Sequence, residues 1–280
     1  MELNLGIRAH DIEGLPLEEL TKTISSKGLS AVQLALAKSF TDFSTETGSL
    51  SPGYARYIGQ SFKKENIDIA ILGCYINMIH PDKYERAKLL DRFKEHIRFA
   101  RDFGCSIVGT ETGAVNAKMG YTVDNFAEGP FHSVVDSVGE LVEEAEKWGV
   151  IVGIEGGINH PIYSPKLMKR LLDNNESNNL QVIFDPANFM SMDYYECQEE
   201  VIEEAFELFG DRMVAMHAKD FVIEDNWIKM VPVGTGLLNY DAVFKHLKKR
   251  KPFMNVLLEN TREPHIDNSI TFLRDKYSKA

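Results

Sequence analysis

The stretch GVIVGIEGGINHP, Gly149 to Pro161, begins with six residues that carry no charge. A nearly continuous apolar run of this kind is typical of a parallel strand that is covered on both faces. Glu155 ends the run and is followed by Gly156 and Gly157. The stretch therefore predicts a buried strand with a carboxylate at its carboxyl end, and that charge requires an explanation.

Seven other stretches of the chain resemble this one, and segments with helical periodicity lie between them. One such segment places Leu89, Phe93 and Ile97 on a single helix face. Ser51-Pro52 and Ser164-Pro165 each offer an N-cap hydroxyl before a proline at the first helical position. The eight predicted strands are residues 3–9, 31–36, 67–74, 106–112, 150–156, 180–186, 213–219 and 255–260.

The repeated order of strand and helix indicates the class of fold. Eight units in 280 residues give roughly 35 residues a unit, which matches a closed (β/α)8 barrel. An open doubly wound sheet is the alternative, but its G-x-G-x-x-G fingerprint is absent after the first strand, where the chain has RAHDIEGLP. We therefore predict one α/β domain, a (β/α)8 TIM barrel, over residues 1–280. Its longer loops, 112–130, 186–198 and 220–238, all follow strands and are expected to build the site.

Composition and charge exclude several classes of protein. Hydrophobic residues make up 44% of the chain, and no stretch approaches the roughly 18 apolar residues of a membrane span, so we predict a soluble protein. The first residues do not resemble a signal peptide. Cys74, Cys105 and Cys197 lack the spacing of a disulfide framework or a thiolate zinc site, so we expect free thiols and a cytoplasmic location. A net charge of -11 would repel nucleic acid.

Four residues with metal-binding side chains stand at the carboxyl ends of four successive predicted strands. They are Glu155, Asp185, His217 and Glu259, and 30, 32 and 42 residues separate them, each about one unit of strand and helix. Equivalent positions on adjacent strands of a barrel converge over the same mouth. The spacing therefore predicts that the four side chains meet at one place.

Electrostatics favours a metal ion among these side chains. Three carboxylates that converge would repel one another, and one would stay protonated unless a cation neutralised them. Three oxygen ligands and one imidazole suit Mn²⁺ or Mg²⁺ and also tolerate Co²⁺ or Zn²⁺. Lys219, two residues after His217, shares its strand face if the strand continues and could supply balancing charge.

The chain resembles the sugar phosphate isomerase and epimerase superfamily, whose members have xylose isomerase-like TIM barrels. Ketose 3-epimerases, inosose dehydratases and hydroxypyruvate isomerases belong to it, and the endonuclease IV type of DNA-repair enzyme is a distant member. The resemblance rests on VGIEGG with Glu155, VIFDPANF with Asp185, MHAKD with His217, VPVGTGLLNYDAVFKHL, and VLLEN with Glu259. These segments occur in the family's order and at its intervals, and the eight-unit pattern extends the match over the whole chain.

The resemblance implies both the metal site and its chemistry. A divalent metal would be held by Glu155, Asp185, His217 and Glu259, and the two glutamates would also serve as acid and base. A substrate with adjacent carbonyl and hydroxyl groups would bind the metal through both oxygens, which would stabilise an enediolate. Return of the proton by the opposite carboxylate would give epimerisation, and return to the neighbouring carbon would give isomerisation.

One position departs from the epimerases. They often carry histidine three residues after the metal-binding aspartate, where it contacts substrate oxygens, but this chain has Asn188. An amide can bind a sugar hydroxyl but cannot transfer a proton. A dehydratase of a cyclic or linear keto-sugar therefore stays open beside an isomerase or epimerase. The HAKD segment resembles the wider family, which makes Lys219 a candidate for substrate contact.

Other residues could also contact the substrate. Glu111 ends the fourth predicted strand, and His80 and His160 each precede a proline in loops after the third and fifth. The two glycines of GTG, 234–236, could approach a sugar or phosphate oxygen through their N–H groups, or form only a turn. The aromatic residues of the long loops could line the site or join protomers: Tyr194, Tyr195 and Trp227.

We therefore predict a metal-dependent isomerase or epimerase that acts on a small sugar or sugar phosphate. An abasic-site endonuclease would need more histidine ligands and a basic groove, and a sugar sensor would not need two bases beside a metal. We expect no partner of the nucleic-acid or membrane class. The resemblance also suggests a homo-oligomer, a dimer or a tetramer.

Overall fold

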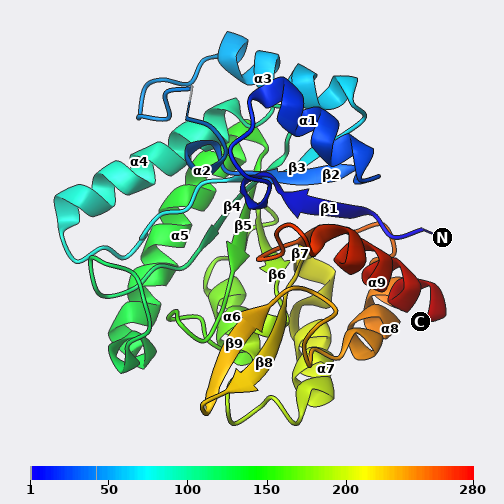
Figure 1. Cartoon of the computed structure of the whole chain (residues 1–280). Helices are drawn as coiled ribbons and strands as arrows, with labels where there is room; N and C mark the ends of the chain where they lie inside the picture. Colours follow the sequence, from blue (N-terminus) through cyan, green and yellow to red (C-terminus); the bar gives the residue numbers. More distant parts are fainter. Residues whose placement is uncertain (1, 42) are drawn as a thin grey trace.

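Eight parallel strands close into a barrel at the centre of the molecule (Figure 1). The computed structural model describes residues 2–41 and 43–280. Around the barrel the strands follow the order β1, β10, β7, β6, β5, β4, β3, β2. The strands are β1 (Leu5–Arg8), β2 (Ala31–Leu34), β3 (Asp68–Gly73), β4 (Ile107–Glu111), β5 (Ile151–Glu155), β6 (Leu180–Phe184), β7 (Met213–Ala218) and β10 (Asn255–Leu258). The predicted (β/α)8 barrel is confirmed, and each strand lies within its predicted range.

Helices form the outer layer of the barrel (Figure 1). One or two helices follow each strand of the barrel along the chain: α1 (Leu17–Ser26), α2 (Leu36–Ser39), α3 (Pro52–Lys64), α4 (Lys83–Phe99), α5 (Glu128–Trp148), α6 (Pro165–Asn174), α7 (Gln198–Phe209), α8 (Tyr240–Arg250) and α9 (Ile266–Lys279). In the described part of the chain, none of these helices has the length and apolar character needed to cross a membrane.

Local signals explain where several helices begin. Ser51 Oγ accepts a hydrogen bond from Tyr54 N at 3.2 Å, and Ser164 Oγ accepts one from Leu167 N at 3.3 Å. A proline follows each of these two serines at the first helical position. Each cap satisfies a backbone donor that the first turn of a helix would otherwise leave unpaired. Both predicted N-caps are confirmed.

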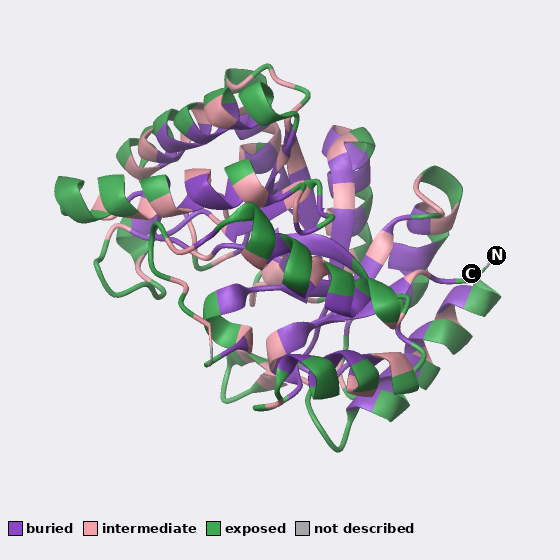
Figure 2. Ribbon diagram, turned by 90° about the horizontal axis from the view of Figure 1, so that it is seen from above, coloured by how far each residue is buried: buried purple, intermediate pink, exposed green. Residues whose placement is uncertain are grey.

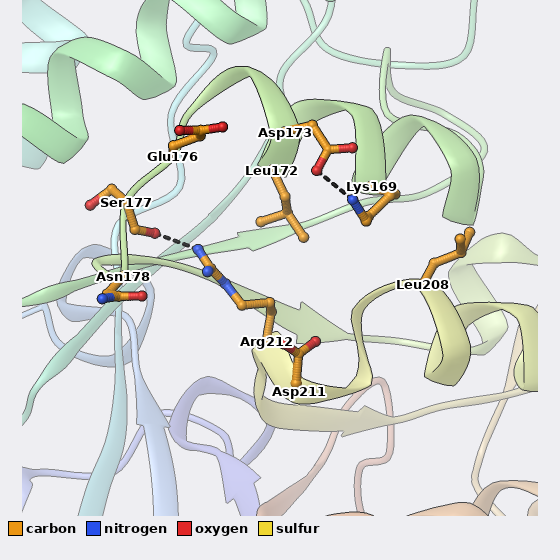
Figure 3. Close-up of a pocket in the computed structure, with 9 residues that line it drawn as sticks. All are labelled: Lys169, Leu172, Asp173, Glu176, Ser177, Asn178, Leu208, Asp211 and Arg212. Atoms are coloured by element: carbon orange, nitrogen blue, oxygen red, sulfur yellow. Dashed lines mark hydrogen bonds and ion pairs between the residues drawn. The ribbon is translucent and has the colours of Figure 1, made fainter.

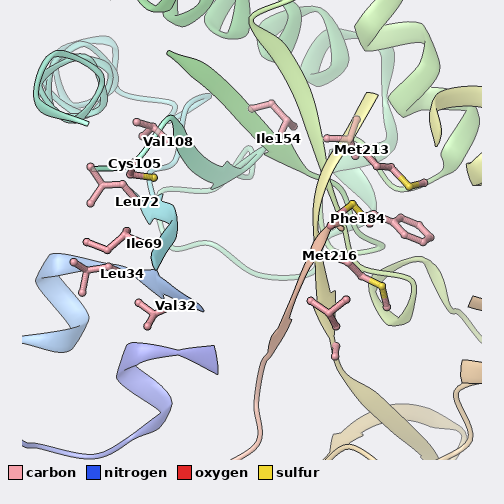
Figure 4. Close-up of a cluster of buried hydrophobic side chains, with 14 of the residues drawn as sticks. Val32, Leu34, Ile69, Leu72, Cys105, Val108, Ile154, Phe184, Met213 and Met216 are labelled. Carbon is pink, nitrogen blue, oxygen red and sulfur yellow. The ribbon is translucent and has the colours of Figure 1, made fainter. Parts of the chain in front are cut away.

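The main core lies between the strands and the helices. Outward-facing strand residues such as Leu34, Leu72 and Val108 are buried there (Figure 4), and the outer faces of the helices are exposed (Figure 2). A smaller apolar cluster fills the barrel, with Ile183 at its centre. A Cβ atom at Gly109 or Gly153 would come within 2.6 or 2.9 Å of Ile183 Cδ1, so glycine there leaves room for this side chain.

One predicted loop contains regular structure. Residues 220–238 were expected to form a loop, but β8 (Asp220–Glu224) and β9 (Trp227–Val231) pair as an antiparallel hairpin. Asp225 and Asn226 connect the two strands with positive φ angles of 49° and 62°. Aspartate and asparagine tolerate this backbone conformation and favour the tight turns of hairpins. The expectation of a plain loop was therefore wrong, and the hairpin rises from the carboxyl end of β7.

Candidate metal centre

The alternation of side chains along the strands brings the four predicted ligands together. Ile183, Ala215 and Leu257 belong to the cluster that fills the barrel, and Asp185, His217 and Glu259 each come two residues later. Residues two apart on a strand share a face, so these ligands also point inward. Glu155 is the last residue of β5 and follows the inward-facing Gly153 in the same way.

The four ligand side chains converge at the carboxyl end of the barrel. One potential ligand atom from each residue lies within 4.8 Å of the others, and all four residues are buried. His217 Nδ1 lies 3.1 Å from Glu155 Oε1 and 2.8 Å from Glu259 Oε2. The prediction that Glu155, Asp185, His217 and Glu259 converge is therefore confirmed.

Three atoms of this cluster lack a hydrogen-bond partner among the described residues. They are Asp185 Oδ2, His217 Nδ1 and Glu259 Oε2, and all are buried. His217 Nδ1 and Glu259 Oε2 are close, but they are not aligned for a hydrogen bond. Buried polar atoms without partners are costly and call for an explanation. A divalent cation bound by these atoms would satisfy all three, so the residues present fit a metal ion.

Gln33 orients the imidazole of His217. Its Oε1 accepts a hydrogen bond from His217 Nε2, and its Nε2 donates to the hydroxyl of Tyr75 at 2.7 Å. Because an amide oxygen can only accept, the proton of a neutral His217 resides on Nε2 and the lone pair on Nδ1 faces the carboxylates. Metal-binding histidines are commonly held in this way by a second residue.

Two cations neutralise part of the acidic cluster. Lys219 Nζ lies 2.8 Å from Glu259 Oε1 and 3.0 Å from Asp185 Oδ2, and Arg8 Nη1 also contacts Glu259 Oε1. Lys219 is only 5% exposed, which confirms the expectation that it balances charge on the face of His217. Arg8 is held in turn by Asp11, whose carboxylate accepts from its Nε and Nη2.

These contacts shift the pKa values of the cluster. Although burial lowers it, Glu155 and Glu259 raise the pKa of His217 to about 10. Burial raises the pKa of Asp185 to about 6. Against the effect of burial, Lys219, His217 and Arg8 hold the pKa of Glu259 well below its usual range. Without a metal, the imidazolium of His217 and the ammonium of Lys219 therefore provide the positive charge.

We expect metal binding to strengthen as the pH rises. Below its pKa of about 10, metal-free His217 holds a proton that the metal must displace, so the apparent affinity should increase by up to about tenfold per pH unit between pH 7 and 8.5. Below pH 6, protonation of Asp185 should steepen this dependence. Isothermal titration with Mn²⁺ in buffers of different ionisation enthalpy should detect release of about one proton at pH 7.5. An affinity that does not change with pH would contradict this account of His217.

Asn188 lies inside the centre, and its contact with substrate stays a prediction. Its Nδ2 donates to Glu155 Oε1 at 2.7 Å, and its Oδ1 accepts from Lys219 Nζ at 3.0 Å. Asp185 Oδ1 accepts from the backbone N–H of Ala187 and Asn188, which fixes the turn after β6. Asn188 therefore links the Glu155 carboxylate to Lys219.

Two of the three further candidates lie together beside the cluster. Glu111 pairs with Glu155 in the register of β4 and β5, and its Oε2 lies 3.9 Å from His160 Nε2. Burial raises the pKa of Glu111, and His160 opposes that shift. His80 accepts a hydrogen bond from the backbone of Asp82, and we find no contact between its ring and the cluster among the described residues. Substrate contacts by the three stay predictions.

The glycines of residues 234–236 do not offer free N–H groups. Gly234 N and Gly236 N donate to Asp220 Oδ2 at 2.9 and 3.0 Å, and Leu238 N donates to Asp220 Oδ1 at 2.9 Å. The possibility that these glycines bind a sugar or phosphate oxygen is therefore wrong for this structure. The loop surrounds the carboxylate of Asp220 because that residue is buried and needs several donors.

Sequence reasoning missed Gln33 and Tyr75. The signal for Gln33 was present, because it is the one polar residue in the predicted apolar strand AVQLAL. His10 also lies near Tyr75, with ring centroids 6.2 Å apart, and both of its ring nitrogens are buried without a partner among the described residues. Burial, assisted by Arg8, lowers the pKa of His10 to about 4. It is therefore a neutral imidazole that can accept or donate a hydrogen bond.

A cavity also lies at the opposite end of the barrel. It has a volume of about 400 Å³ and is lined by the end of α6, by the loop before β6 and by the loop before β7 (Figure 3). Lys169 and Asp173 form an ion pair at the cavity. Arg212 donates to the backbone oxygen of Ser177 in the loop before β6 and to that of Leu180, the first residue of β6. Because loops that precede the strands lie at their amino ends, this cavity is remote from the metal centre.

Comparison with known proteins gives the family. The model of the xylose isomerase-like TIM barrel family matches residues 22–276. A structure described as a D-tagatose 3-epimerase-like protein has a TM-score of 0.75 and 18% identity over 100% of this chain and 98% of that one. The IOLI protein with a bound zinc atom has a TM-score of 0.72 and 17% identity over 100% and 96%.

A third structure, the probable 3-DHS dehydratase AsbF from Bacillus anthracis, has a TM-score of 0.73 and 12% identity over 98% of each chain. No curated protein sequence matches this chain. At these identities the solved structures show the shared fold, and the family model covers most of the sequence. The chain therefore belongs to the xylose isomerase-like TIM barrel family.

Proposed function

We propose that the protein is a metal-dependent isomerase or epimerase of a small sugar or sugar phosphate. The observation that carries the proposal is the buried cluster of Glu155, Asp185, His217 and Glu259. Three of its ligand atoms have no hydrogen-bond partner within residues 2–41 and 43–280. Glu155 and Glu259 come from β5 and from the end of β10, with β6 and β7 between those strands in the barrel. Two carboxylates therefore approach the same place from different directions, as proton transfer on both faces of a carbon requires.

The two glutamates would divide the proton transfers. The low pKa of Glu259 keeps it ionised at neutral pH, so it can accept a proton from the carbon beside the substrate carbonyl. Glu155, oriented by Asn188, would carry a proton taken up from solvent and deliver it to the opposite face or to the neighbouring carbon. A bound divalent cation would polarise the carbonyl and so acidify the C–H bond. Lys219 and Arg8 would stabilise negative charge on the substrate oxygens and on Glu259.

The cofactor of this proposal is Mn²⁺ or Mg²⁺. Three carboxylates and one imidazole form a ligand set dominated by oxygen, which favours these hard cations. Zn²⁺ and Co²⁺ are also compatible, and the structurally similar IOLI protein binds zinc. The expected partner is a small carbohydrate, and we propose that the chain forms a homo-oligomer.

A dehydratase is the second candidate function. Two observations favour it: the structural similarity to a probable 3-DHS dehydratase, and Asn188, an amide that cannot transfer a proton. A dehydratase begins with the same removal of a proton beside a carbonyl, but a hydroxyl group then leaves the neighbouring carbon. The two functions differ in whether the product has lost water.

Incubation with a panel of ketoses, ketose phosphates and keto-acids in D₂O, with and without Mn²⁺, tests the proposal. We expect deuterium from the solvent to enter a product carbon of one substrate class, only with metal, and with no other change in mass. A product lighter by the mass of water would favour the dehydratase. Turnover without any exchange would contradict proton transfer by the glutamates.

A further inference from the structure

A second cluster of reactive side chains lies outside the barrel wall, between β2, β3 and α4. Cys74 follows β3 and lines a cavity of about 70 Å³ together with Tyr75, Lys38, Thr45, Arg92 and His96. Tyr75 points to the barrel interior, where its hydroxyl meets Gln33, so Cys74, one residue earlier, faces α4 instead. Among the described residues, no hydrogen bond or ion pair joins Cys74 or His96 to a proposed metal ligand. The cavity adjoins the metal centre through Tyr75, whose hydroxyl meets Gln33.

The charged side chains that line this cavity are all basic. Lys38, Arg92 and His96 are basic, and no carboxylate of the described residues lines the cavity. Glu95, on the same helix, accepts hydrogen bonds from the backbone N–H groups of Gly48 and Leu50 and is thereby occupied elsewhere.

Tyr75 cannot supply the missing negative charge. Burial raises its pKa well above the ordinary value, so its hydroxyl stays neutral at physiological pH. Cys74 is the one remaining acidic group among the described residues of the lining. The lining therefore favours a thiolate at Cys74.

The hydrogen bonds of His96 and Arg92, both on α4, leave one side-chain nitrogen of each residue available to the thiol. His96 Nδ1 lies 2.9 Å from the carbonyl oxygen of Arg92, which can only accept, so this nitrogen carries a proton and Nε2 is the atom left to face the thiol. Arg92 donates through Nη2 to the carbonyl oxygen of Tyr75, and its Nε is buried without a hydrogen-bond partner among the described residues.

The pKa values of Cys74 and His96 agree with this arrangement. Although burial alone would raise it, the His96 and Arg92 side chains lower the pKa of Cys74. Burial opposes protonation of His96, but the neighbouring sulfur atom raises the pKa of that imidazole. Lys38 lies over the Tyr75 ring, with Nζ 3.9 Å from the ring centroid, and adds positive charge to the same cavity.

We propose that Cys74 and His96 form a thiolate and imidazolium pair, and that Cys74 is a site of oxidation by hydrogen peroxide. The thiolate sulfur attacks one oxygen of the peroxide, an S–O bond forms and the O–O bond breaks. The sulfur is oxidised by two electrons to sulfenic acid, and the peroxide is reduced to hydroxide. This hydroxide takes a proton from the His96 imidazolium and leaves as water, so the pair ends uncharged.

The size of the cavity restricts the oxidant. Cys74 is 3% exposed, so reagents must enter the cavity of about 70 Å³, which has room for a molecule as small as hydrogen peroxide, since one water occupies about 30 Å³ of liquid. A bulky aromatic disulfide is too large. The reaction is therefore selective for small oxidants, unlike that of an exposed thiol.

The two other cysteines provide controls within the same chain. Burial raises the pKa of Cys105 to about 11, and its thiol lies 3.2 Å from the carbonyl oxygen of Ile107, so it should stay reduced. Cys197 is partly exposed and serves as the accessible thiol of the comparison.

The test exposes the folded protein to hydrogen peroxide between pH 6 and 8, then quenches it in denaturant with dimedone and an alkylating reagent. Peptide mass spectrometry follows each cysteine. We expect Cys74 to be oxidised at least about tenfold faster than Cys105 at every pH, with little dependence on pH. In His96→Gln the rate at pH 6 should fall at least about tenfold and should recover as the pH rises, because the thiol must then ionise unaided.

Thermal unfolding and circular dichroism establish that His96→Gln is folded. Should that variant be unstable, Lys38→Met removes another cation that lines the cavity and should slow oxidation of Cys74 at pH 6 in the same direction. Equal rates for Cys74 and Cys105 in the native protein, or an unchanged Cys74 rate at pH 6 in a folded variant, would overturn the proposal.

Discussion

Glu259→Gln should lower kcat for the proton-transfer reaction by at least about 100-fold, because an amide cannot accept the proton that the carboxylate removes. Glutamine has nearly the same size and keeps one oxygen that can face a cation, so the change isolates the loss of the base. The native carboxylate meets His217, Lys219 and Arg8, which keep it ionised. Glu155→Gln should have an effect of similar size, because the second glutamate returns the proton.

The measurement uses whichever substrate the panel in D₂O identifies and compares kcat with KM at saturating metal. Glu224→Gln is the matched control, because Glu224 is 55% exposed and pairs with Lys229 on the hairpin. That variant should keep the native kcat. The proposed mechanism fails if Glu155→Gln and Glu259→Gln, both folded and both loaded with metal, turn over at the native rate.

Lys219→Met should destabilise the metal-free protein by about 3 kcal/mol or more, since removal of one partner from a buried ion pair leaves an uncompensated charge. Lys219 Nζ lies near three carboxylates, those of Asp185, Glu259 and Glu155, at 3.0, 2.8 and 3.9 Å. Methionine has a similar length but no charge. Mn²⁺ should restore much of the lost stability, because the cation takes over neutralisation of the same carboxylates.

Denaturant unfolding with and without Mn²⁺ measures this linkage. A ligand present at about 100 times its Kd stabilises a protein by about 2.7 kcal/mol. At one shared concentration of Mn²⁺, the gain in the free energy of unfolding should be larger for Lys219→Met than for the native protein. Lys229→Met removes an ammonium whose side chain is 54% exposed and should change stability by less than about 1 kcal/mol. An equal increment from Mn²⁺ in the native protein and in Lys219→Met would show that Lys219 and the metal do not serve the same carboxylates.

The strand periodicity explains why much of the centre could be predicted. Each barrel strand is a short apolar run, and a ligand at the carboxyl end of one run recurs after one unit of strand and helix. Asp185, His217 and Glu259 share the inward face with Ile183, Ala215 and Leu257. Residues two apart on a strand share a face. The alternation along each strand and the closure of the barrel therefore both place these ligands at the inner mouth.

The parts that could not be predicted depend on contacts between distant segments. Gln33 reaches His217 across 184 positions of the sequence, and only closure of the barrel reveals that these residues meet. The glycines of residues 234–236 looked free because their acceptor, Asp220, is the first residue of a hairpin that the pattern did not indicate. Asp225 and Asn226 were the available signal for that hairpin, since both adopt positive φ angles in its turn.

The measurement that tests the central claim most directly is anomalous diffraction from crystals soaked with Mn²⁺. We predict one strong peak at the carboxyl end of the barrel, within coordination distance of Glu155, Asp185, His217 and Glu259, and its loss in His217→Ala. A native crystal with saturating Mn²⁺ but no peak among these four residues, or a peak that persists unchanged in His217→Ala, would contradict the assignment of the metal centre.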